Sequence, residues 1–569
     1  MIQFHKRHAK IRPPQDNAFL SRLVILLGIL TSAILLALPP ADGQASHPTE
    51  IKKSPPGFEN RVIRKISGEI PAFADVERFQ ISPDSLHVVY QADPQTDEVI
   101  QYYSTPASGY GSPVSLSTPS TVIDQMGQYE ISPDSRRVVY LGMFAPLYTQ
   151  ELFSVPIGGG PIALLNHTLT SYQSVSHFLI SPDSSTVVYE AERLSDGIME
   201  LYSVPISGGT PVKLNGSLTS GGEVSDWNTV ISPDSSRVVY RADQETRWIY
   251  EVYSVPIGGG PWIKINGALP SYGDVNWFGL SPDGSQVVYV AEQETTSVSE
   301  LFSAPIGGGP WVKLSGLLPS GGNVEDWGVQ ISPDSSRVVY FAEQESYDLY
   351  ELFSAPIGVG GSAVKLNGPL ISGGEVSFFE ISPDSSRVVY GADQQSDGVY
   401  ELYSVPIGGG SWLKLNGAMI SGGDVDYFAI TPDSSRVVYR ADKTTEDVFD
   451  LFSAPIGGGS VNLLNLTYQD NRDVHYFRLS PDSSYVVYLS DMFSDQVDEL
   501  SLAWPISSAY PNIPRISGTL ADGGDVEEFG IAGNGRYIIY QADQEINDKV
   551  ELYSVFSEAG PIYLPLLKK

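Results

Sequence analysis

The segment ISPDSSRVVY, from Ile331 to Tyr340, recurs ten times along this chain with small changes. The aspartate of its turn and its closing tyrosine keep their spacing, although Asn534 replaces the aspartate in the last copy. Successive turns are separated by 49 to 52 residues, a period that is typical of stacked or radial repeat proteins. Ten unbroken copies therefore predict one repeat array instead of several unrelated domains.

Each repeat contains four short extended segments separated by turn residues. In one copy they are Val376 to Ile381, Arg387 to Ala392, Glu401 to Ile407 and Trp412 to Leu415, which we call strands a, b, c and d. Pro383 and Asp384 supply the turn between strands a and b, and a run of glycines separates c from d. Four short strands in about 50 residues predict one blade of a β-propeller.

The repeat pattern begins partway through a unit. Residues 62–79, VIRKISGEIPAFADVERF, align with a strand d and the loop that leads to the next strand a. We therefore expect the strand near Val62–Ile66 to complete the last blade and close a ring. The predicted fold is an all-β propeller of ten four-stranded blades. Two smaller propellers in tandem are the alternative, because ten exceeds the usual four to eight blades.

The repeated SPD turn, the apolar strand that follows it and strands of the ELYSVPIGG type resemble the WD-like propeller repeats of the TolB family. The resemblance covers residues 61–567 and implies the propeller fold. It does not extend to the separate N-terminal α/β domain of TolB-type proteins, nor to the hydrolase domain of prolyl oligopeptidase-like enzymes. No Gly-x-Ser-x-Gly motif for a nucleophilic serine occurs in the chain.

The N-terminal region has the features of an export signal. Basic residues precede an apolar run from Leu23 to Leu38, and the small residues Gly43 and Ala45 follow it. We predict a signal peptide over residues 1–45, then a linker over 46–60 and the repeat domain over 61–569. An uncleaved membrane anchor formed by residues 23–38 is the alternative. In both cases the repeats would be periplasmic, at the cell surface or secreted.

Composition excludes several classes of function. The chain has no cysteine, which rules out disulfides and thiolate chemistry, and its seven histidines show no metal-ligand spacing outside the leader. We therefore predict no metal site and no cofactor. The formal net charge of −33 opposes binding to nucleic acids and to anionic membranes, but it is compatible with a basic partner.

Acidic residues recur at fixed positions of the repeat. One column follows the closing tyrosine by three positions, a second opens strand c and a third precedes strand a. The d–a and b–c loops should share one face of a propeller, which we call the acidic face. Cations in strand d, from Lys65 to Arg515, should partly offset these charges. The first column, the rim acids, is a candidate binding surface: Asp93, Glu192, Asp243, Glu292, Glu343, Asp393, Asp442, Asp491 and Asp543.

The second copy breaks this pattern in its b–c loop. Where other copies have polar residues, it carries Met143, Phe144, Leu147 and Tyr148. Exposed apolar loops can mark contact surfaces, so these four residues form a second candidate binding site. Packing of the loop against the N-terminal linker is the alternative.

The sequence favours a non-catalytic binding or scaffold protein at the cell envelope or outside the cell. A protein or a glycan is the expected ligand, and the chain is expected to be a monomer. The alternative is a propeller-type hydrolase or lyase that acts on extracellular polysaccharide or peptide. Two carboxyl groups would suffice for glycosidase chemistry, but no pair is singled out and no catalytic residue is assigned.

Overall fold

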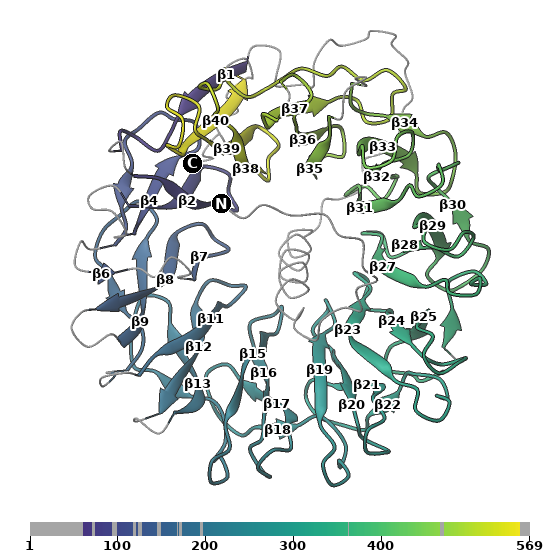
Figure 1. The fold of residues 1–569 in the computed structure, drawn as a ribbon. Helices are drawn as coiled ribbons and strands as arrows, with labels where there is room; N and C mark the ends of the chain where they lie inside the picture. The colour runs from purple at the N-terminus through teal and green to yellow at the C-terminus, as the bar shows by residue number, and fades with distance from the viewer. Residues whose placement is uncertain are drawn as a thin grey trace, which may run out of the picture. The chain divides into compact units, whose positions relative to one another are not determined.

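The computed structural model describes residues 61–557, except 71–73, 94–99, 118–120, 123–127, 145–148, 168, 170–172, 194–196, 362, 467–471 and 495. All regular structure in this part of the chain is β, and its forty strands form ten antiparallel sheets arranged in one ring (Figure 1). The prediction of a single ten-bladed propeller is confirmed, and two rings in tandem are excluded. No helix among these residues is long and apolar enough to cross a membrane. The predicted leader and linker over residues 1–60 lie outside the described residues.

Each blade has its first strand at the inner side of the ring and its last strand at the outside (Figure 1). The inner strands are β2 (Val76–Ile81), β7 (Tyr129–Ile131), β11 (Val175–Ile180), β15 (Val224–Ile231), β19 (Val275–Leu280), β23 (Val324–Ile331), β27 (Val376–Ile381), β31 (Val425–Ile430), β35 (Val474–Leu479) and β38 (Val526–Ile531). The second strands are β3 (His87–Ala92), β8 (Arg137–Phe144), β12 (Thr186–Arg193), β16 (Arg237–Ala242), β20 (Gln286–Ala291), β24 (Arg337–Ala342), β28 (Arg387–Ala392), β32 (Arg436–Ala441), β36 (Val486–Ser490) and β39 (Tyr537–Ala542).

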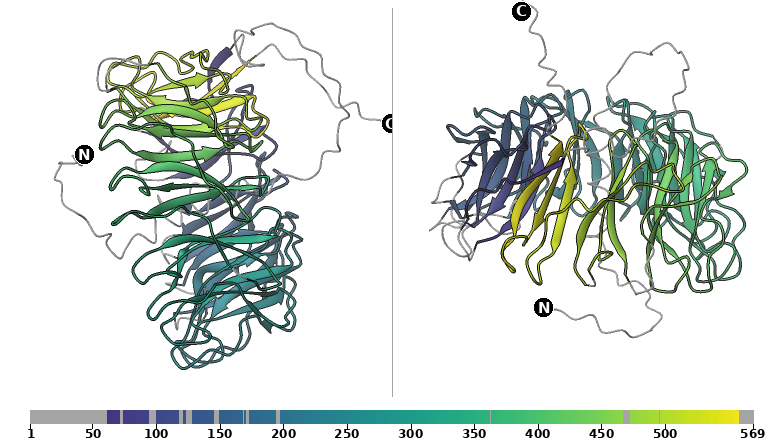
Figure 2. Two further views of the ribbon diagram at one scale, coloured as in Figure 1. Left: turned by 90° about the vertical axis from the view of Figure 1, so that its right-hand side faces the viewer. Right: turned by 90° about the horizontal axis from the view of Figure 1, so that it is seen from above.

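The third strands are β4 (Gln101–Pro106), β9 (Thr149–Pro156), β13 (Ile198–Pro205), β17 (Glu251–Pro256), β21 (Glu300–Pro305), β25 (Glu351–Pro356), β29 (Glu401–Pro406), β33 (Asp450–Pro455), β37 (Glu499–Ala503) and β40 (Glu551–Ser557). The short outer strands are β5 (Val114–Ser115), β10 (Ala163–Leu164), β14 (Val212–Lys213), β18 (Ile263–Lys264), β22 (Val312–Lys313), β26 (Val364–Lys365), β30 (Leu413–Lys414) and β34 (Asn462–Leu463). Blades are numbered 1 to 10 by their inner strands in chain order, and seen edge-on they form one layer (Figure 2).

The first described strand closes the ring, as predicted. β1 (Arg61–Lys65) pairs antiparallel with β40, from Arg61 opposite Ser557 to Lys65 opposite Tyr553, and so supplies the outer strand of blade 10. Ile63 packs against the hydrophobic core of that blade. The two ends of the described chain are therefore held in one sheet.

Two blades depart from four strands. Blade 2 has a fifth strand, β6 (Thr121–Val122), which pairs with the extended β8. In blade 9 the expected fourth strand is reduced to isolated bridges, Ser501 with Arg515 and Trp504 with Asn512. Proline at positions 511 and 514 explains this reduction, because proline has no backbone N–H to donate to a neighbouring strand.

The hydrophobic core lies between consecutive blades. In blade 4, Val238 and Tyr240 of β16 are fully buried and belong to a cluster that also contains Val188 and Leu201 of blade 3. Nine of the ten closing tyrosines stack on the aromatic residue of the adjacent third strand, as Tyr240 does on Tyr253 at 5.6 Å between ring centroids, whereas Tyr488 lies opposite Ser501. The repeated Val-Val-Tyr segment is thus the element that joins one blade to the next.

The turn between the first two strands also links neighbouring blades. Asp334 Oδ1 accepts hydrogen bonds from Ser336 N and from Ser332 Oγ, which confirms the local turn role predicted for this aspartate. Ser335, at φ 63°, presents its hydroxyl to the preceding blade, where the backbone N–H of Asp283 donates to it at 2.9 Å. Eight such bonds occur among the described residues, and Gly284 and Gly535 replace the serine in the other two turns.

Candidate functional site

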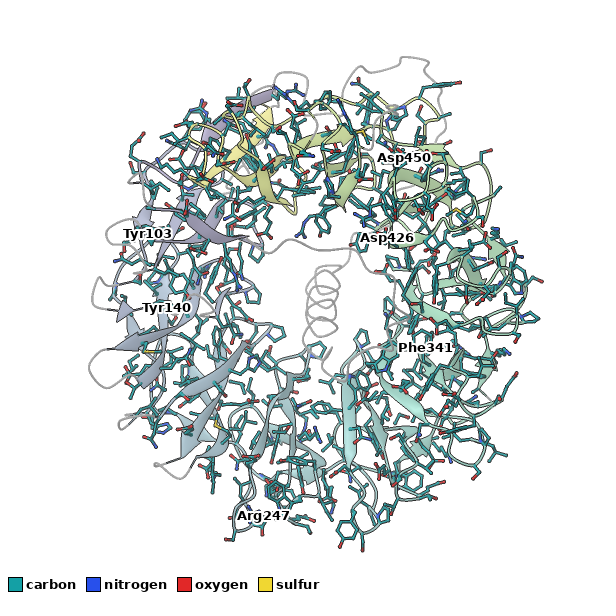
Figure 3. All side chains as sticks on the ribbon, viewed as in Figure 1. Tyr103, Tyr140, Arg247, Phe341, Asp426 and Asp450 are labelled. Atoms are coloured by element: carbon teal, nitrogen blue, oxygen red, sulfur yellow. The ribbon has the colours of Figure 1, made fainter. Side chains whose placement is uncertain are left out.

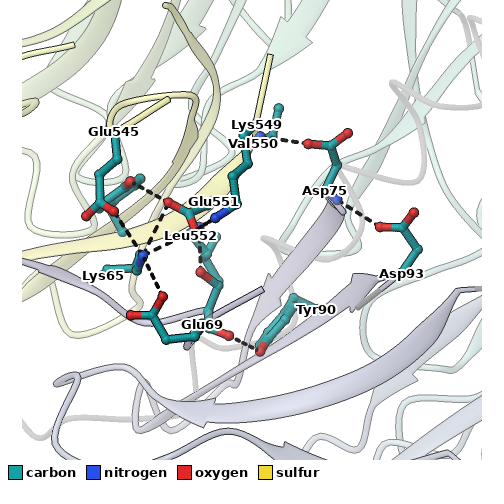
Figure 4. A network of polar contacts seen from close by, with 12 residues as sticks. Lys65, Glu69, Asp75, Tyr90, Asp93, Glu545, Lys549, Val550, Glu551 and Leu552 are labelled. Atoms are coloured by element: carbon teal, nitrogen blue, oxygen red, sulfur yellow. Dashed lines mark hydrogen bonds and ion pairs between the residues drawn. The ribbon is translucent and has the colours of Figure 1, made fainter. Parts of the chain in front are cut away.

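The d–a and b–c loops share one face of the propeller, as predicted. The backbone N–H of Asp75 donates to Asp93 Oδ1 at 2.8 Å, and Asp75 Oδ1 accepts from Val550 N at 2.8 Å (Figure 4). Asp75 lies just before strand a, Asp93 just after strand b and Val550 just before strand c. These short bonds bring the first and third acidic columns together at the acidic face.

The rim acids are placed differently from the expectation of a solvent-exposed row. Asp243 is 1% exposed, and Asp93, Glu343, Asp393, Asp442, Asp491 and Asp543 are buried as well, whereas Glu192 and Glu292 are half-buried. Asp243 Oδ1 accepts from Glu223 N and its Oδ2 accepts from Trp248 N. The carboxylate therefore ties the two loops together through backbone donors. Most of these carboxylates are therefore not exposed at the surface, and their binding to a partner stays a prediction.

The second acidic column is paired with the strand-d cations. Glu251 at the start of β17 lies 3.0 Å from Lys264 Nζ and also accepts a hydrogen bond from Tyr253 OH at 2.9 Å. Lys65 and Glu551 form the same pair in blade 10, at 3.2 Å (Figure 4). The glutamates are buried and the lysines are partly exposed. The predicted offset of charge is therefore achieved by ion pairs between the two strands.

The candidate apolar loop of blade 2 is only partly described. Met143 is half-buried on β8, opposite Val122 of β6 and Gln150 of β9. The backbone of Phe144 continues β8 opposite Thr149. Leu147 and Tyr148 lie outside the described residues, so a contact role for this loop stays a prediction.

A cavity of about 320 Å³ opens on the acidic face between blades 5 and 6. Its lining consists of Asn276, Glu292, Ser297, Ser299, Asn323, Val324, Glu325 and Asp326. Three of these side chains are carboxylates, and no lysine or arginine is among them. The volume lies within the range of pockets that bind small molecules or single side chains.

Ser299 brings a small side chain to the cavity wall. The same repeat position, just before strand c, carries an aromatic residue in blades 4, 6, 7 and 8: Tyr250, Tyr350, Tyr400 and Phe449. Tyr400 OH, for example, donates to Glu375 and fills the corresponding space. In blade 5 Asn276 Nδ2 donates to Ser299 Oγ at 3.0 Å, and Ser299 N donates to Asn323 Oδ1 at 2.8 Å.

An irregularity of β23 supplies two of the carboxylates. β15 and β23 are two residues longer than the other complete inner strands, and each bulges between its first valine and the segment before the turn. Both bulges contain Asp-Trp, at residues 226–227 and 326–327. Bulges of this kind often redirect side chains next to functional sites. Here the bulge places Glu325 and Asp326 in the cavity wall.

The side chains of Glu325 and Trp327 form a hydrogen bond. Burial raises the pKa of Glu325, hydrogen bonds from Tyr350 and Trp327 lower it, and the charges of Asp326 and Glu343 raise it, with a net increase. The Trp327 ring is tilted against Phe341 at 5.4 Å, yet the residue is 49% exposed. A large aromatic side chain is therefore fixed in place with half of its surface in solvent.

Of the residues predicted from the acidic columns, only Glu292 lines the cavity. The other lining residues were missed, because the prediction followed positions that every repeat shares. Two signals in the sequence mark them: the extra Asp-Trp residues before two of the turns, and serine where neighbouring copies carry tyrosine or phenylalanine.

The residues present favour binding of a cation or of another ligand rich in hydrogen-bond donors. Carboxylate, amide and hydroxyl oxygens dominate the lining and can accept hydrogen bonds. Within the described part of the chain, no group of three or more His, Asp or Glu residues is arranged to hold a metal ion.

Comparison with known proteins assigns neither a family nor an activity to this chain. No family model and no curated protein matches the chain, so membership of the TolB family is not shown. A TolB-like protein from Agrobacterium tumefaciens is 18% identical over 45% of this chain and 83% of its own, with a TM-score of 0.28. Porphyromonas gingivalis dipeptidyl peptidase 4 is 9% identical over 82% of this chain and 65% of its own, with a TM-score of 0.45. A GH74 enzyme from Niastella koreensis is 13% identical over 82% of this chain and 75% of its own, at 0.31. At these scores none of them assigns an activity.

Proposed function

We propose that this protein is an exported, non-catalytic β-propeller that binds a basic partner protein through its acidic face, at the cell envelope or outside the cell. The observation that carries the proposal is the cavity between blades 5 and 6, which is lined by three carboxylates and by no cationic side chain. A positively charged group of a partner would satisfy these carboxylates, whereas an anionic ligand would be repelled.

Exposed acids in the b–c loops extend the same charge around the ring. Glu446, Asp397 and Asp548 are exposed on this face. Glu245 and Glu345 are exposed as well, but they form ion pairs with Lys264 and Lys365. Spaced surface charges of one sign accelerate the encounter with an oppositely charged partner and contribute less to the lifetime of the complex. We therefore expect association to be fast at low salt and slower as salt increases.

The test is capture of partners from envelope extracts, followed by association kinetics with the captured protein. Replacement of Asp326, Asp397 and Glu446 by Asn or Gln should slow association at least several-fold at low salt. The control is Arg136→Gln, which removes an exposed charge from the opposite face and should leave association unchanged. If Met143→Ser with Phe144→Ser abolishes binding and the charge variant does not, the apolar loop is the contact and the proposal fails.

A hydrolase or lyase that acts on extracellular polysaccharide or peptide is the second candidate. The favouring observation is Glu325, whose pKa is raised beside the carboxyl group of Asp326 in a cavity wall. Two carboxyl groups close together in a cavity wall are the kind of pair that glycosidase-type acid–base catalysis uses. Turnover of glycans or peptides that is lost in Glu325→Gln would establish this activity and overturn the binding proposal.

A further inference from the structure

The space that forms a cavity between blades 5 and 6 is filled between blades 8 and 9 by a side chain of the protein itself. The guanidinium of Arg440 on β32 donates to Asp426 Oδ1 at 2.9 Å and to Val474 O at 3.1 Å. A further bond reaches His475 O, and the guanidinium carbon lies 4.8 Å from the centre of the Phe449 ring. Asp426 lies on the inner side of blade 8 (Figure 3).

Strand register makes the two places equivalent. Arg440 pairs with Tyr427 on one side and Leu451 on the other, and Val290 of β20 pairs with Trp277 and Leu301 in the same way. Val290 therefore stands where Arg440 stands, and Ser299 stands where Phe449 stands. The partners of Arg440 correspond in blades 5 and 6 to Asn276, Val324 and Glu325, and all three line the cavity.

Blade 4 repeats the arrangement of blade 8. Arg241 of β16 occupies the same position, and its guanidinium carbon lies 4.5 Å from the centre of the Tyr250 ring. At this repeat position, a guanidinium thus lies over an aromatic ring in two blades. Blade 5 lacks both the arginine and the aromatic residue, and a cavity remains.

The cavity of blade 5 adds groups that suit a guanidinium supplied from outside. Glu292, Glu325 and Asp326 provide carboxylate oxygens, and the half-exposed Trp327 follows directly in the chain. A guanidinium has five donors and no acceptor, which matches a lining rich in acceptors, and it stacks well on indole. A neutral sugar would need more donors than the Asn and Ser side chains provide.

We propose that the cavity between blades 5 and 6 is an arginine pocket, which receives an arginine side chain of the partner in the place that Arg440 fills internally. This inference rests on the proposed binding function and identifies the chemical group that the acidic face recognises. The carboxylates of Glu325 and Asp326, which line the cavity, bind the guanidinium.

The test uses small probes and does not require the natural partner. Nα-acetyl-L-arginine amide should bind the wild-type protein in ligand-observed NMR or calorimetry at low salt. The citrulline analogue has nearly the same shape but no charge, and it should bind at least tenfold more weakly. Equal binding of the two probes, absence of arginine binding, or binding of neutral oligosaccharides in its place would overturn the proposal.

Two variants make the assignment specific to this cavity. Val290→Arg should place an internal guanidinium in the pocket, as in blade 8, and should abolish probe binding in the folded protein, at some cost in thermal stability because Val290 is fully buried. As a control, Arg440→Val combined with Phe449→Ser opens the corresponding space between blades 8 and 9, where His475 replaces Glu325 and Asp326 has no counterpart, and should leave the probe stoichiometry at one. A thermal scan shows that each variant is folded, and unchanged probe binding by folded Val290→Arg would overturn the proposal.

The pocket and the proposed function can fail separately. If the basic partner binds Val290→Arg as tightly as wild type while the probe does not, the acidic face binds its partner without this pocket. If the probe binds wild type but no basic partner is captured at the acidic face, the pocket stands and the proposed function fails.

Discussion

The backbone N–H of Asn534 in blade 10 donates a 3.1 Å hydrogen bond to Ser85 Oγ in blade 1, across 449 positions of sequence. This bond links blade 10 to blade 1 through their turns between the first and second strands. In addition, β1 pairs with β40 at the outer edge of blade 10. The ring is therefore closed by two separate contacts, the Asn534–Ser85 hydrogen bond and the β1–β40 strand pairing.

The serines of these turns combine a strained backbone with an inter-blade bond. At Ser335, with φ 63°, replacement by alanine removes the acceptor and keeps the left-handed conformation, so the free energy of unfolding should fall by about 1–2 kcal/mol. Ser335→Gly loses the same bond but relieves the strain, and should cost less. Thermal unfolding of both variants checks this order, and equal losses would contradict it.

The buried rim acids should contribute measurably to the free energy of unfolding. Asp393→Asn removes the charge that accepts hydrogen bonds from Glu375 N and Gly398 N, and we expect a loss of about 2 kcal/mol in the free energy of unfolding. The exposed Glu446→Gln serves as the matched control and should change stability by less than about 0.5 kcal/mol. Denaturant unfolding distinguishes the two, and no difference between them would show that the backbone contacts contribute nothing.

The ion pairs of the third and outer strands should be strongly coupled. Lys264→Met leaves the buried Glu251 without its cation and should destabilise the protein by about 1–3 kcal/mol. The double variant with Glu251→Gln removes the uncompensated charge and should recover part of this loss. A double-mutant cycle measured by thermal unfolding gives the coupling energy, and additive losses would show that the pair is not coupled.

Glu380 on β27 should make stability depend on pH. Burial raises the pKa of this carboxyl group to about 7, above the 4.5 expected when the chain is unfolded. The unfolded state therefore releases its proton first, so the contribution of Glu380 to stability is complete below pH 4.5 and is lost as pH rises to about 7. Glu380→Gln should raise the free energy of unfolding at pH 8 by up to about 3 kcal/mol and leave it nearly unchanged at pH 4. Equal effects at the two pH values would refute this assignment.

Most of the fold could be predicted from the sequence because the repeat determines it locally. The strands expected over Val376–Ile381 and Arg387–Ala392 coincide with β27 and β28, and the closing strand expected near Val62 is β1. The loss of the fourth strand in blade 9 could not be predicted from the repeat period. It results from two prolines after the c–d turn, which remove backbone donors.

The candidate site could not be predicted in the same way. A column of acids at one repeat position indicates that every blade needs a carboxylate there, but not whether its partner is a ligand or a backbone N–H. The buried Asp243 has backbone partners, Glu223 N and Trp248 N. The cavity lies where Val290 and Ser299 replace the larger side chains of Arg440 and Phe449 in blade 8. This difference is recognised only when the two blades are compared in the structure.

The closure of blade 10 also has a consequence in time. Lys65 and its partner Glu551 are 486 positions apart, and at synthesis rates of about 5–20 residues per second β1 exists for roughly half a minute or longer before β40 is made. Throughout that interval β1 has no strand to pair with, while blades 1 to 9 can already form from neighbouring segments. The slow step in forming this protein is therefore expected to be the meeting of its earliest and latest strands, after the blades themselves are complete.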